Sequence, residues 1–476
     1  MNIHDATQLS LGFWHGRTVD FEPVDEQLSS DGGLLAFGLF DSHLGWTKSF
    51  AQLLSHPGRM HSAQTMLRQR VFGIIAGYED QNDHDALRSD PIFKLLADRA
   101  PNERDLASQP TLSRFENRVT APDLLHVEEW FLERFVESFD EPPRRITLDI
   151  DTFDDPTHGA QQLALFHGYY EQHQYQVRVI SCAENDLVVL PVLLFGSATA
   201  SLGAADDLAR VIQRLRARFP DVLIHVRADA GFAKPEIYET LEAYSQVDYS
   251  IGYEMNPALC RISEELLQST VELFAEHGTP QKQYLCCTQQ ARTWDRPRDV
   301  VIKCEVNQEG TNRRAVVTNR PGAALQPDGV YQEYADRGES ENRHKELKCQ
   351  FKTDRLSDHR YMANLFRLAM HVLAANLLVA FRQRVAQELP EPPSPDGLPL
   401  EARSPWQKRQ HHNQRRREDP LGAGHACTWR MLVIKVATRV VVTTRRVKLL
   451  ISRHWPNGQY LAQVCAALRQ LSADTS

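Results

Sequence analysis

The sequence predicts an α+β protein of several domains, and three features lead to this prediction. Its 476 residues exceed what a single hydrophobic core ordinarily holds, so two to four domains are expected. Apolar residues recur with a helical period in the first third of the chain. In the middle third, stretches typical of strands alternate with stretches typical of helices, which indicates a mixed layer beside a helical one.

The N-terminal part of the chain predicts a helical region. Segments 30–45, 62–81 and 122–139 each carry apolar side chains at the spacing of one helix face. Residues 141–145 (EPPRR) indicate a linker, because two adjacent prolines interrupt any regular element. We therefore place the first domain at residues 1–145.

A mixed α/β layer is predicted for residues 146–256. Runs rich in β-branched residues predict five strands, and two amphipathic segments predict helices between them. The predicted strands are 144–151, 175–184, 187–198, 223–229 and 247–255, and the predicted helices are 204–219 and 234–244.

The rest of the chain predicts three further parts. Residues 257–330 carry short strand-like pieces between turns, which predict a small β-rich insertion with Trp294 in its core. Residues 331–385 return to a helical period and continue the mixed layer. Residues 386–476 begin with a Pro-rich linker and form a basic C-terminal extension.

Basic residues are concentrated near the C-terminus. The formal net charge is −8, yet residues 403–455 contain thirteen Lys or Arg and two Asp or Glu, a net of +11 that leaves −19 elsewhere. A cationic end on an anionic body is typical of a local contact with nucleic-acid phosphates, for which Arg415, Arg416 and Arg417 are candidates. A solvated tail has the same composition and is the alternative.

Neither a disulfide-stabilised secreted protein nor a membrane protein is predicted. The eight cysteines are scattered without a CxxC pair, which favours reduced thiols over a zinc site. The longest apolar stretch, 368–381, is too short to cross a bilayer and contains His371 and Asn376. The N-terminus lacks the basic-then-apolar pattern of a signal peptide. We expect a cytoplasmic protein without membrane contact.

Three acidic residues occupy positions suited to metal-assisted chemistry. Asp151 and Asp229 end predicted strands, and Glu341 lies in a predicted helix. Carboxylates at neighbouring strand ends, joined by one from a helix, can bind two Mg²⁺ or Mn²⁺ ions that assist phosphoryl transfer. Asp149 faces the same way as Asp151 and is an alternative ligand. Asp151 is preferred because sites in open α/β sheets form at the carboxyl ends of strands.

The segment around Glu341 presents a phenol and three charged groups on one predicted helix face. At about 100° per residue, these side chains fall within an arc of about 60°, whereas those of Glu339 and Glu346 point elsewhere. The four residues of this face are Tyr334, Arg337, Glu341 and Lys348. Cations beside a metal-binding carboxylate can hold phosphates. A surface face of salt bridges is the alternative.

Several motifs together resemble a known family. The spacing of Tyr334, Arg337, Glu341 and Lys348 is similar to the Tyr-Arg-Glu-Lys signature of a large superfamily of bacterial insertion-sequence transposases. The segments LDIDTFDDPTHGAQQ, with HGYY downstream, and VRADAGF resemble the first and second Asp motifs of the group-one DDE transposases. The N-terminal LSSDGGLLAFGLFDSHLG and the basic WRMLVIKVATRVVVTTRRVKLL also resemble that group, so the resemblance covers most of the chain.

The resemblance implies a fold and an activity. It implies an RNase H-like core with a β-rich insertion between the second Asp and the Glu, and a helical N-terminal region for DNA-end recognition or dimer contacts. Asp151, Asp229 and Glu341 would be the catalytic metal ligands, and Tyr334, Arg337 and Lys348 of the helix face would bind DNA.

The implied reaction is metal-dependent cleavage at the terminal inverted repeats of an insertion sequence, followed by strand transfer into target DNA. A homodimer on double-stranded DNA, in a bacterial cytoplasm and associated with the nucleoid, would carry it out. Two alternatives are a two-metal nuclease of the same fold without strand transfer, and a decayed copy that only binds DNA.

Overall fold

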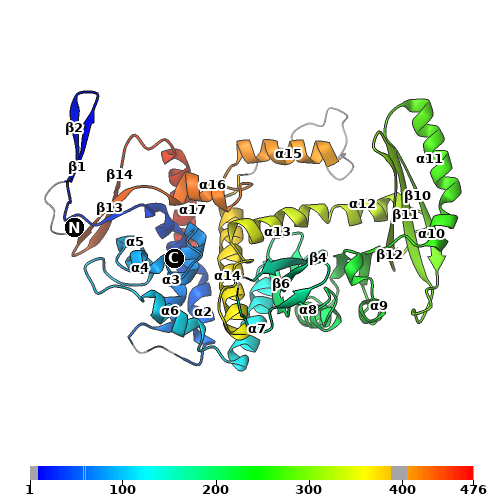
Figure 1. Cartoon of the computed structure of the whole chain (residues 1–476), viewed down its shortest axis with the longest axis horizontal. Helices are drawn as coiled ribbons and strands as arrows, with labels where there is room; N and C mark the ends of the chain where they lie inside the picture. Colours follow the sequence, from blue (N-terminus) through cyan, green and yellow to red (C-terminus); the bar gives the residue numbers. More distant parts are fainter. Residues whose placement is uncertain (1–8, 57, 59, 158, 388–404, 475–476) are drawn as a thin grey trace.

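The protein has a mixed α+β architecture, as predicted, with one large mixed sheet. A helical half and a sheet half meet along the long helix α14 (Tyr361–Val385) (Figure 1). The computed structural model describes residues 9–56, 58, 60–157, 159–387 and 405–474.

The N-terminal region is helical after a short β-hairpin. The helices are α1 (Leu35–Leu44), α2 (Trp46–Gln52), α3 (Ala63–Ala76), α4 (His84–Leu87), α5 (Pro91–Leu96), α6 (Gln109–Glu116) and α7 (Ala121–Glu137). The hairpin of β1 (Leu9–Trp14) and β2 (Arg17–Phe21) was not predicted, and it projects from the body of the molecule (Figure 1). Thr120 caps α7 in a capping box with Asp123, which fixes where the helix begins.

Nine strands form the central sheet. In order across the sheet they are β10, β11, β12, β9, β8, β4, β6 and β5, with β7 also pairing with β6. Their bounds are β4 (Arg145–Pro156), β5 (Leu165–His167), β6 (Gln172–Cys182), β7 (Val188–Leu194), β8 (Leu223–Ala228), β9 (Val247–Tyr253), β10 (Gln281–Gln289), β11 (Arg298–Asn307) and β12 (Gly310–Thr318). β4 runs parallel to β8 and antiparallel to β6, and β8 runs parallel to β9. The helices α8 (Ala204–Arg218) and α9 (Pro235–Glu242) connect β7 to β8 and β8 to β9.

The segment predicted as a β-rich insertion contains two helices as well as three strands. It begins with α10 (Pro257–Ile262) and α11 (Glu264–His277), and only then forms β10 to β12. The three strands extend the central sheet, because β12 pairs with β9. The helices were missed although Gly278 ends α11 in the left-handed conformation, a common helix stop. Trp294 is 6% exposed and packs against Tyr238, as expected for a core residue.

Two helices, α12 (Pro327–Ala335) and α13 (Gly338–Gln350), form where the sequence suggested one. Asp336 and Arg337 between them keep helical backbone angles, so the two helices continue in nearly the same direction (Figure 1). The buried α14 follows, and it alone among the described helices has the length and apolarity of a membrane span. Its Asn376 side chain hydrogen-bonds to the backbone of Val188 at both N and O, at 2.9 and 2.8 Å. The apolar character of α14 therefore reflects packing inside the protein.

The C-terminal segment packs against the N-terminal helices. It contains α15 (Pro405–Glu418), α16 (Ala426–Trp429), a π-helical turn (Arg430–Ile434), β13 (Thr438–Thr443), β14 (Arg446–Ile451) and α17 (Gly458–Asp474). β13 pairs with β3 (Leu28–Ser29), and Trp429 packs on Phe37 and Phe381. From α16 onward this segment thus completes the helical half, whereas the sequence suggested a separate extension.

Candidate active site

Two carboxylates lie at the same level on neighbouring parallel strands. The last paired residues of β4 and β8 are Ile150 and Ala228, and Asp151 and Asp229 come directly after them. Asp229 caps a short 3₁₀ turn and accepts a hydrogen bond from the Gly231 amide at 2.9 Å. Asp151 lies inside β4 and not at its end as predicted, because β6 continues to pair with β4 beyond the point where β8 stops.

The alternative residue, Asp149, is fully engaged elsewhere. It is completely buried, and Arg227 donates to its two oxygens at 2.7 and 2.8 Å. Arg227 also donates to the backbone carbonyl of Glu333 at 3.0 Å, which fixes α12 against the sheet. Arg227 already balances the charge of Asp149 in a buried bidentate pair. Asp151 is therefore better suited than Asp149 to bind a metal ion.

Arg337 connects the strand carboxylates to the helix carboxylate. Its Nη1 donates to Asp151 Oδ2 at 2.8 Å, and its Nη2 is 3.8 Å from Glu341 Oε1. Although burial opposes the charge, Asp151 and other nearby acids raise the pKa of the Arg337 guanidinium. The Glu341 side chain is 53% exposed, so it is the most accessible of the three carboxylates.

The charges at this site are not balanced by the protein alone. Burial raises the pKa of Asp229, and the negative charge of Asp151 raises it further. Carboxylate oxygens are the donors that Mg²⁺ or Mn²⁺ prefers. Because like charges repel one another, a cation bound between these carboxylates would also relieve their repulsion. Within the described ranges no three His, Cys, Asp or Glu side chains are close enough together to hold a metal ion. The oxygen donors therefore fit a divalent cation, but the contacts with Arg337 hold the acids in an arrangement other than that of ligands around a metal ion.

Comparison with known proteins identifies the family. Residues 13–391 match the family model described as transposase DDE domain, group 1. The chain belongs to this family. It is therefore a DDE transposase, an enzyme that cleaves DNA and transfers strands, and DNA is its partner.

No curated protein matches the sequence of this transposase. A solved structure, the cryo-EM synaptic complex of piggyBac transposase with hairpin DNA, is similar with 12% sequence identity and a TM-score of 0.39. The similarity covers 75% of this chain and 77% of that one.

One residue of the candidate site, His344, was not predicted from the sequence. Its Nδ1 is 3.4 Å from Asp151 Oδ2, and its Nε2 is buried with no hydrogen-bond partner in the described part of the chain. Although burial opposes it, contact with His344 and the charge of Arg337 lower the pKa of Asp151. His344 lies three residues after Glu341, on the same helix face, so helical spacing could have identified it.

The other two residues of the predicted helix face lie on either side of these acids. Lys348 Nζ is 2.5 Å from Asp154 Oδ1, further along β4. Tyr334 is partly buried beside Arg337 and Asp229, and burial raises its pKa. The predicted face thus meets the sheet from Tyr334 to Lys348, although it spans two helices.

Glu346 lies on the other side of α13, as the helical spacing predicted. Arg382 Nη2 is 2.7 Å from its Oε1, and the Ala426 amide donates to the same oxygen at 2.7 Å. Despite burial, Arg382 and His425 hold the pKa of Glu346 at about 2. This carboxylate fastens α13 to α14 and α16, so its substitution would disturb the fold.

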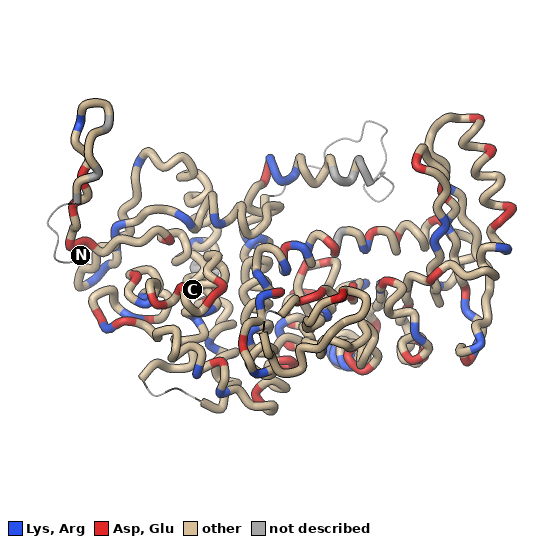
Figure 2. Tube along the Cα trace, in the orientation of Figure 1, with Lys and Arg blue, Asp and Glu red and all other residues tan. Residues whose placement is uncertain are grey.

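The basic residues of α15 are not brought to the carboxylates. In Figure 1 this helix runs apart from α12 and α13, and Figure 2 shows a run of basic residues near its C-terminal end. That run is Arg415, Arg416 and Arg417, all at least partly exposed.

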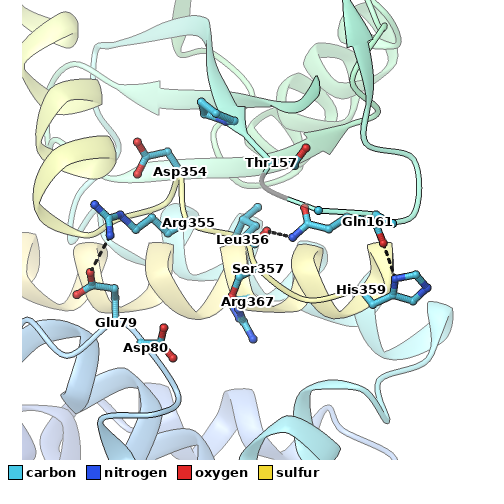
Figure 3. A pocket seen from close by; sticks show the side chains of 13 residues that line it. Glu79, Asp80, Thr157, Gln161, Asp354, Arg355, Leu356, Ser357, His359 and Arg367 are labelled. Atoms are coloured by element: carbon cyan, nitrogen blue, oxygen red, sulfur yellow. Dashed lines mark hydrogen bonds and ion pairs between the residues drawn. The ribbon is translucent and has the colours of Figure 1, made fainter. Parts of the chain in front are cut away.

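A cavity of about 670 Å³ lies at the end of β4, where Pro156 contributes to its lining. Glu79 and Asp80 of the N-terminal half line one side, and the segment from Asp354 to His359 lines the other (Figure 3). Arg355 Nη1 is 4.0 Å from Glu79 Oε1 across it. None of Asp151, Asp229 and Glu341 lines this cavity, so it is a cleft between the two halves of the transposase.

Proposed function

We propose that Asp151, Asp229 and Glu341 are the Asp, Asp and Glu of this DDE transposase and hold two Mg²⁺ or Mn²⁺ ions. The observation that carries the proposal is the alignment of Asp151 with Asp229 on neighbouring parallel strands, with Glu341 on the other side of the Arg337 guanidinium. When bound, the ions would generate the nucleophile and stabilise the attacking and leaving oxygens of phosphoryl transfer.

The strand order supports an RNase H-like core for this site. Across the sheet the strands follow in the order β7, β6, β4, β8 and β9. β6 runs antiparallel to both of its neighbours, β7 and β4, whereas β8 and β9 run parallel to β4. β10 to β12, together with α10 and α11, would be the insertion between the second Asp and the Glu.

Arg337 and Lys348 would exchange carboxylate partners for phosphates when DNA binds. Each now neutralises an acid of β4, Arg337 at Asp151 and Lys348 at Asp154. Both groups bind phosphate oxygens as well as carboxylates, the guanidinium through two parallel N–H donors and the ammonium as a point charge. A cation that enters beside Asp151 competes with Arg337, and an arriving phosphate gives Arg337 a new partner. DNA and metal would therefore bind together more strongly than either binds alone.

In this proposal the DNA is cut at the terminal inverted repeats of a bacterial insertion sequence, and the freed 3′-OH then attacks target DNA at the same site. The basic α15 would hold phosphates of the bound duplex through Arg415, Arg416 and Arg417. The helical N-terminal region would recognise the ends or join two subunits of a homodimer associated with the nucleoid.

A strand-transfer assay tests the proposal. The purified full chain is incubated with a labelled DNA end taken from the sequence flanking its gene, a target plasmid and Mg²⁺, with excess chelator as the reference. We expect cut ends and joined products with Mg²⁺, and neither with chelator or with Asp151→Asn. Cutting without joining would favour a two-metal nuclease, binding alone would indicate a decayed copy, and full cutting in chelator would refute the metal site.

A further inference from the structure

The β13–β14 hairpin belongs to a part of the chain that has no acidic residue. Residues 420–473 contain eight Lys or Arg and no Asp or Glu, although the whole chain has a formal net charge of −8. A segment with charges of one sign creates a local positive potential unless acids from elsewhere in the protein cancel it. Its cations therefore either pair with acids of other segments or are available to an anionic partner.

Three of these cations hold the segment against the N-terminal half of the protein. Lys435 Nζ is 2.7 Å from Asp31 Oδ1, and Arg439 Nη1 is 2.7 Å from Glu26 Oε1. Arg430 donates to backbone carbonyls of α3. Four others are exposed, and their side chains have no hydrogen-bond or ion-pair partner in the described part of the chain: Arg445, Arg446, Lys448 and Arg453.

The two faces of the hairpin differ in composition. β13 pairs with β14 from Thr438 opposite Ile451 to Thr443 opposite Arg446, so alternate residues share a face. One face has no charged side chain and consists of Thr438, Val440, Val442, Val447, Leu449 and Ile451. The other, which we call the basic face, consists of Arg439, Val441, Thr443, Arg446, Lys448 and Leu450. Thr438 and Val440 are buried, so the uncharged face fastens the hairpin to the body and the basic face is directed to solvent.

The hairpin lies away from the carboxylate site. Figure 1 shows β13 and β14 at the end of the molecule where β1 and β2 project, whereas α13, which carries Glu341, lies on the other side of α14. The basic face therefore takes no part in cutting, but it can hold a duplex that continues beyond the cut.

We propose that the basic face, together with Arg445 at the turn, binds the duplex of the element end at base pairs away from the cut. The inference rests on the proposed function, which brings a DNA end to the carboxylates. A two-stranded ribbon fits the major groove of B-DNA, so Arg445 can enter the groove while Arg446 and Lys448 contact phosphates beside it.

The element end suits this surface better than target DNA does. The acids at the cut repel phosphates, so affinity for the end has to come from cations elsewhere on the protein. The same end must also stay bound through two steps, cutting and joining, whereas target DNA takes part only in the second. A contact outside the cutting site can last through both steps.

A comparison of long and short duplexes tests the inference by binding alone. Duplexes with the end sequence from the flank of the gene are shortened stepwise from their inner side and bound by the full chain in Ca²⁺. Replacing Arg445, Arg446 and Lys448 with Ala should flatten the slope of log affinity against log salt by about two to three on long duplexes. The advantage of the wild type should then shrink about 10- to 40-fold between about 50 and 200 mM salt. Below one duplex length, the wild type and the variant should bind alike, because the duplex no longer reaches the hairpin.

Two further variants serve as controls. Replacing Arg445 and Arg446 with Lys keeps their charges and should keep the slope. Arg17→Ala removes an exposed cation from the β1–β2 hairpin and should also leave the slope unchanged.

Four results would overturn the proposal. They are an unchanged slope on long duplexes, an equal loss on long and short duplexes, a loss confined to capture of a target plasmid, and a change in oligomeric state without a change in slope. The last two would assign the hairpin to target DNA and to a second copy of the chain. Cutting that survives Asp151→Asn would instead refute the proposed function and leave the binding comparison unaffected, so the two failures are distinguishable.

Discussion

Two groups of ionised side chains, one in each half of the molecule, have opposite compositions. In the helical half, Arg70 and Arg367 share the single carboxylate of Glu116, at 2.8 and 2.7 Å. At the sheet, three carboxylates, Asp151, Asp229 and Glu341, are grouped around one guanidinium, that of Arg337. The first group is almost entirely buried, whereas the second is partly open to solvent.

The difference separates a structural function from a chemical one. Glu116 has a cation at each oxygen, so nothing further is needed to balance it. The acids at the sheet outnumber the cations beside them, and burial, followed by the charge of Asp151, raises the pKa of Asp229. The buried group of two guanidiniums around one carboxylate joins α3, α6 and α14, whereas an acidic excess at a surface is suited to bind an external cation.

The largest effect is expected at the acids of the sheet. Glu341→Gln keeps the side-chain shape but removes the charge that would hold metal, so cleavage should fall by more than about a thousandfold. Gel assays of DNA cleavage and DNA binding measure the two effects separately, and binding should stay near the wild-type level.

Asp229→Asn should also abolish cutting while slightly raising the melting temperature, because it removes a carboxylate whose charge is disfavoured on folding.

Two substitutions serve as controls for this prediction. Glu346→Gln, on the other side of the same helix, breaks the buried contact with Arg382, so it should lower stability while folded molecules still cut. Glu272→Gln on the exposed face of α11 should change neither property. Equal loss of cutting per folded molecule at Glu341 and Glu346 would contradict the assignment of the two faces.

The next effect is expected at the buried group around Glu116. Glu116→Gln leaves Arg70 buried without a carboxylate and leaves Arg367 with only Asp358, 3.9 Å away, so about 3–5 kcal/mol of unfolding free energy should be lost. Although burial opposes it, Arg367 and Arg70 hold the pKa of Glu116 at about 2, below its ordinary value of 4.5. Its stabilisation is therefore complete above pH 4.5 and is lost as the pH falls toward about 2. Chemical denaturation at several pH values measures both, and an unchanged acid limb in Glu116→Gln would contradict the prediction.

The sequence predicted local spacing on the helix face better than contacts between distant parts of the chain. Spacing alone placed Arg337, Glu341 and Lys348 on one face, because the helical period is a local property of the chain. The balanced pair of Asp149 and Arg227 joins two strands that are 78 residues apart, and no local pattern reveals such a contact. For the same reason the pairing of β13 with β3 was not predicted.

A smaller effect is expected at a second buried carboxyl of β4, Asp155. It is fully buried, and neither oxygen has a hydrogen-bond partner by geometry among the residues described, although the Leu356 amide favours its charged form. Burial, followed by the charge of Asp354, raises its pKa to about 8 from 3.8. Stability should therefore decline as the pH rises from 3.8 toward about 8, since the unfolded chain ionises first.

Asp155→Asn should remove this decline. The gain should be about 1–3 kcal/mol above pH 8 and should vanish in acid, because the neutral amide avoids the cost of an unpaired buried charge. Thermal unfolding from pH 5 to 9 measures it, with exposed Asp221→Asn as the reference. If the stability of Asp155→Asn and of the wild type depended on pH in the same way, the Asp155 carboxyl would have a hydrogen-bond partner in solution and the prediction would be wrong.

The smallest effect per residue is expected at α15, where cations are exposed and salt screens them. Each phosphate contact of a Lys or Arg contributes about 0.9 to the slope of log affinity against log salt on duplex DNA. Replacing Arg415, Arg416 and Arg417 with Ala should therefore flatten the slope by about two to three and weaken binding of all sequences alike. Cleavage of bound DNA should continue, because α15 lies apart from α13, which carries Glu341 (Figure 1). An unchanged slope would show that α15 is only a solvated helix, and the open acids around Arg337 would then have to engage DNA without it.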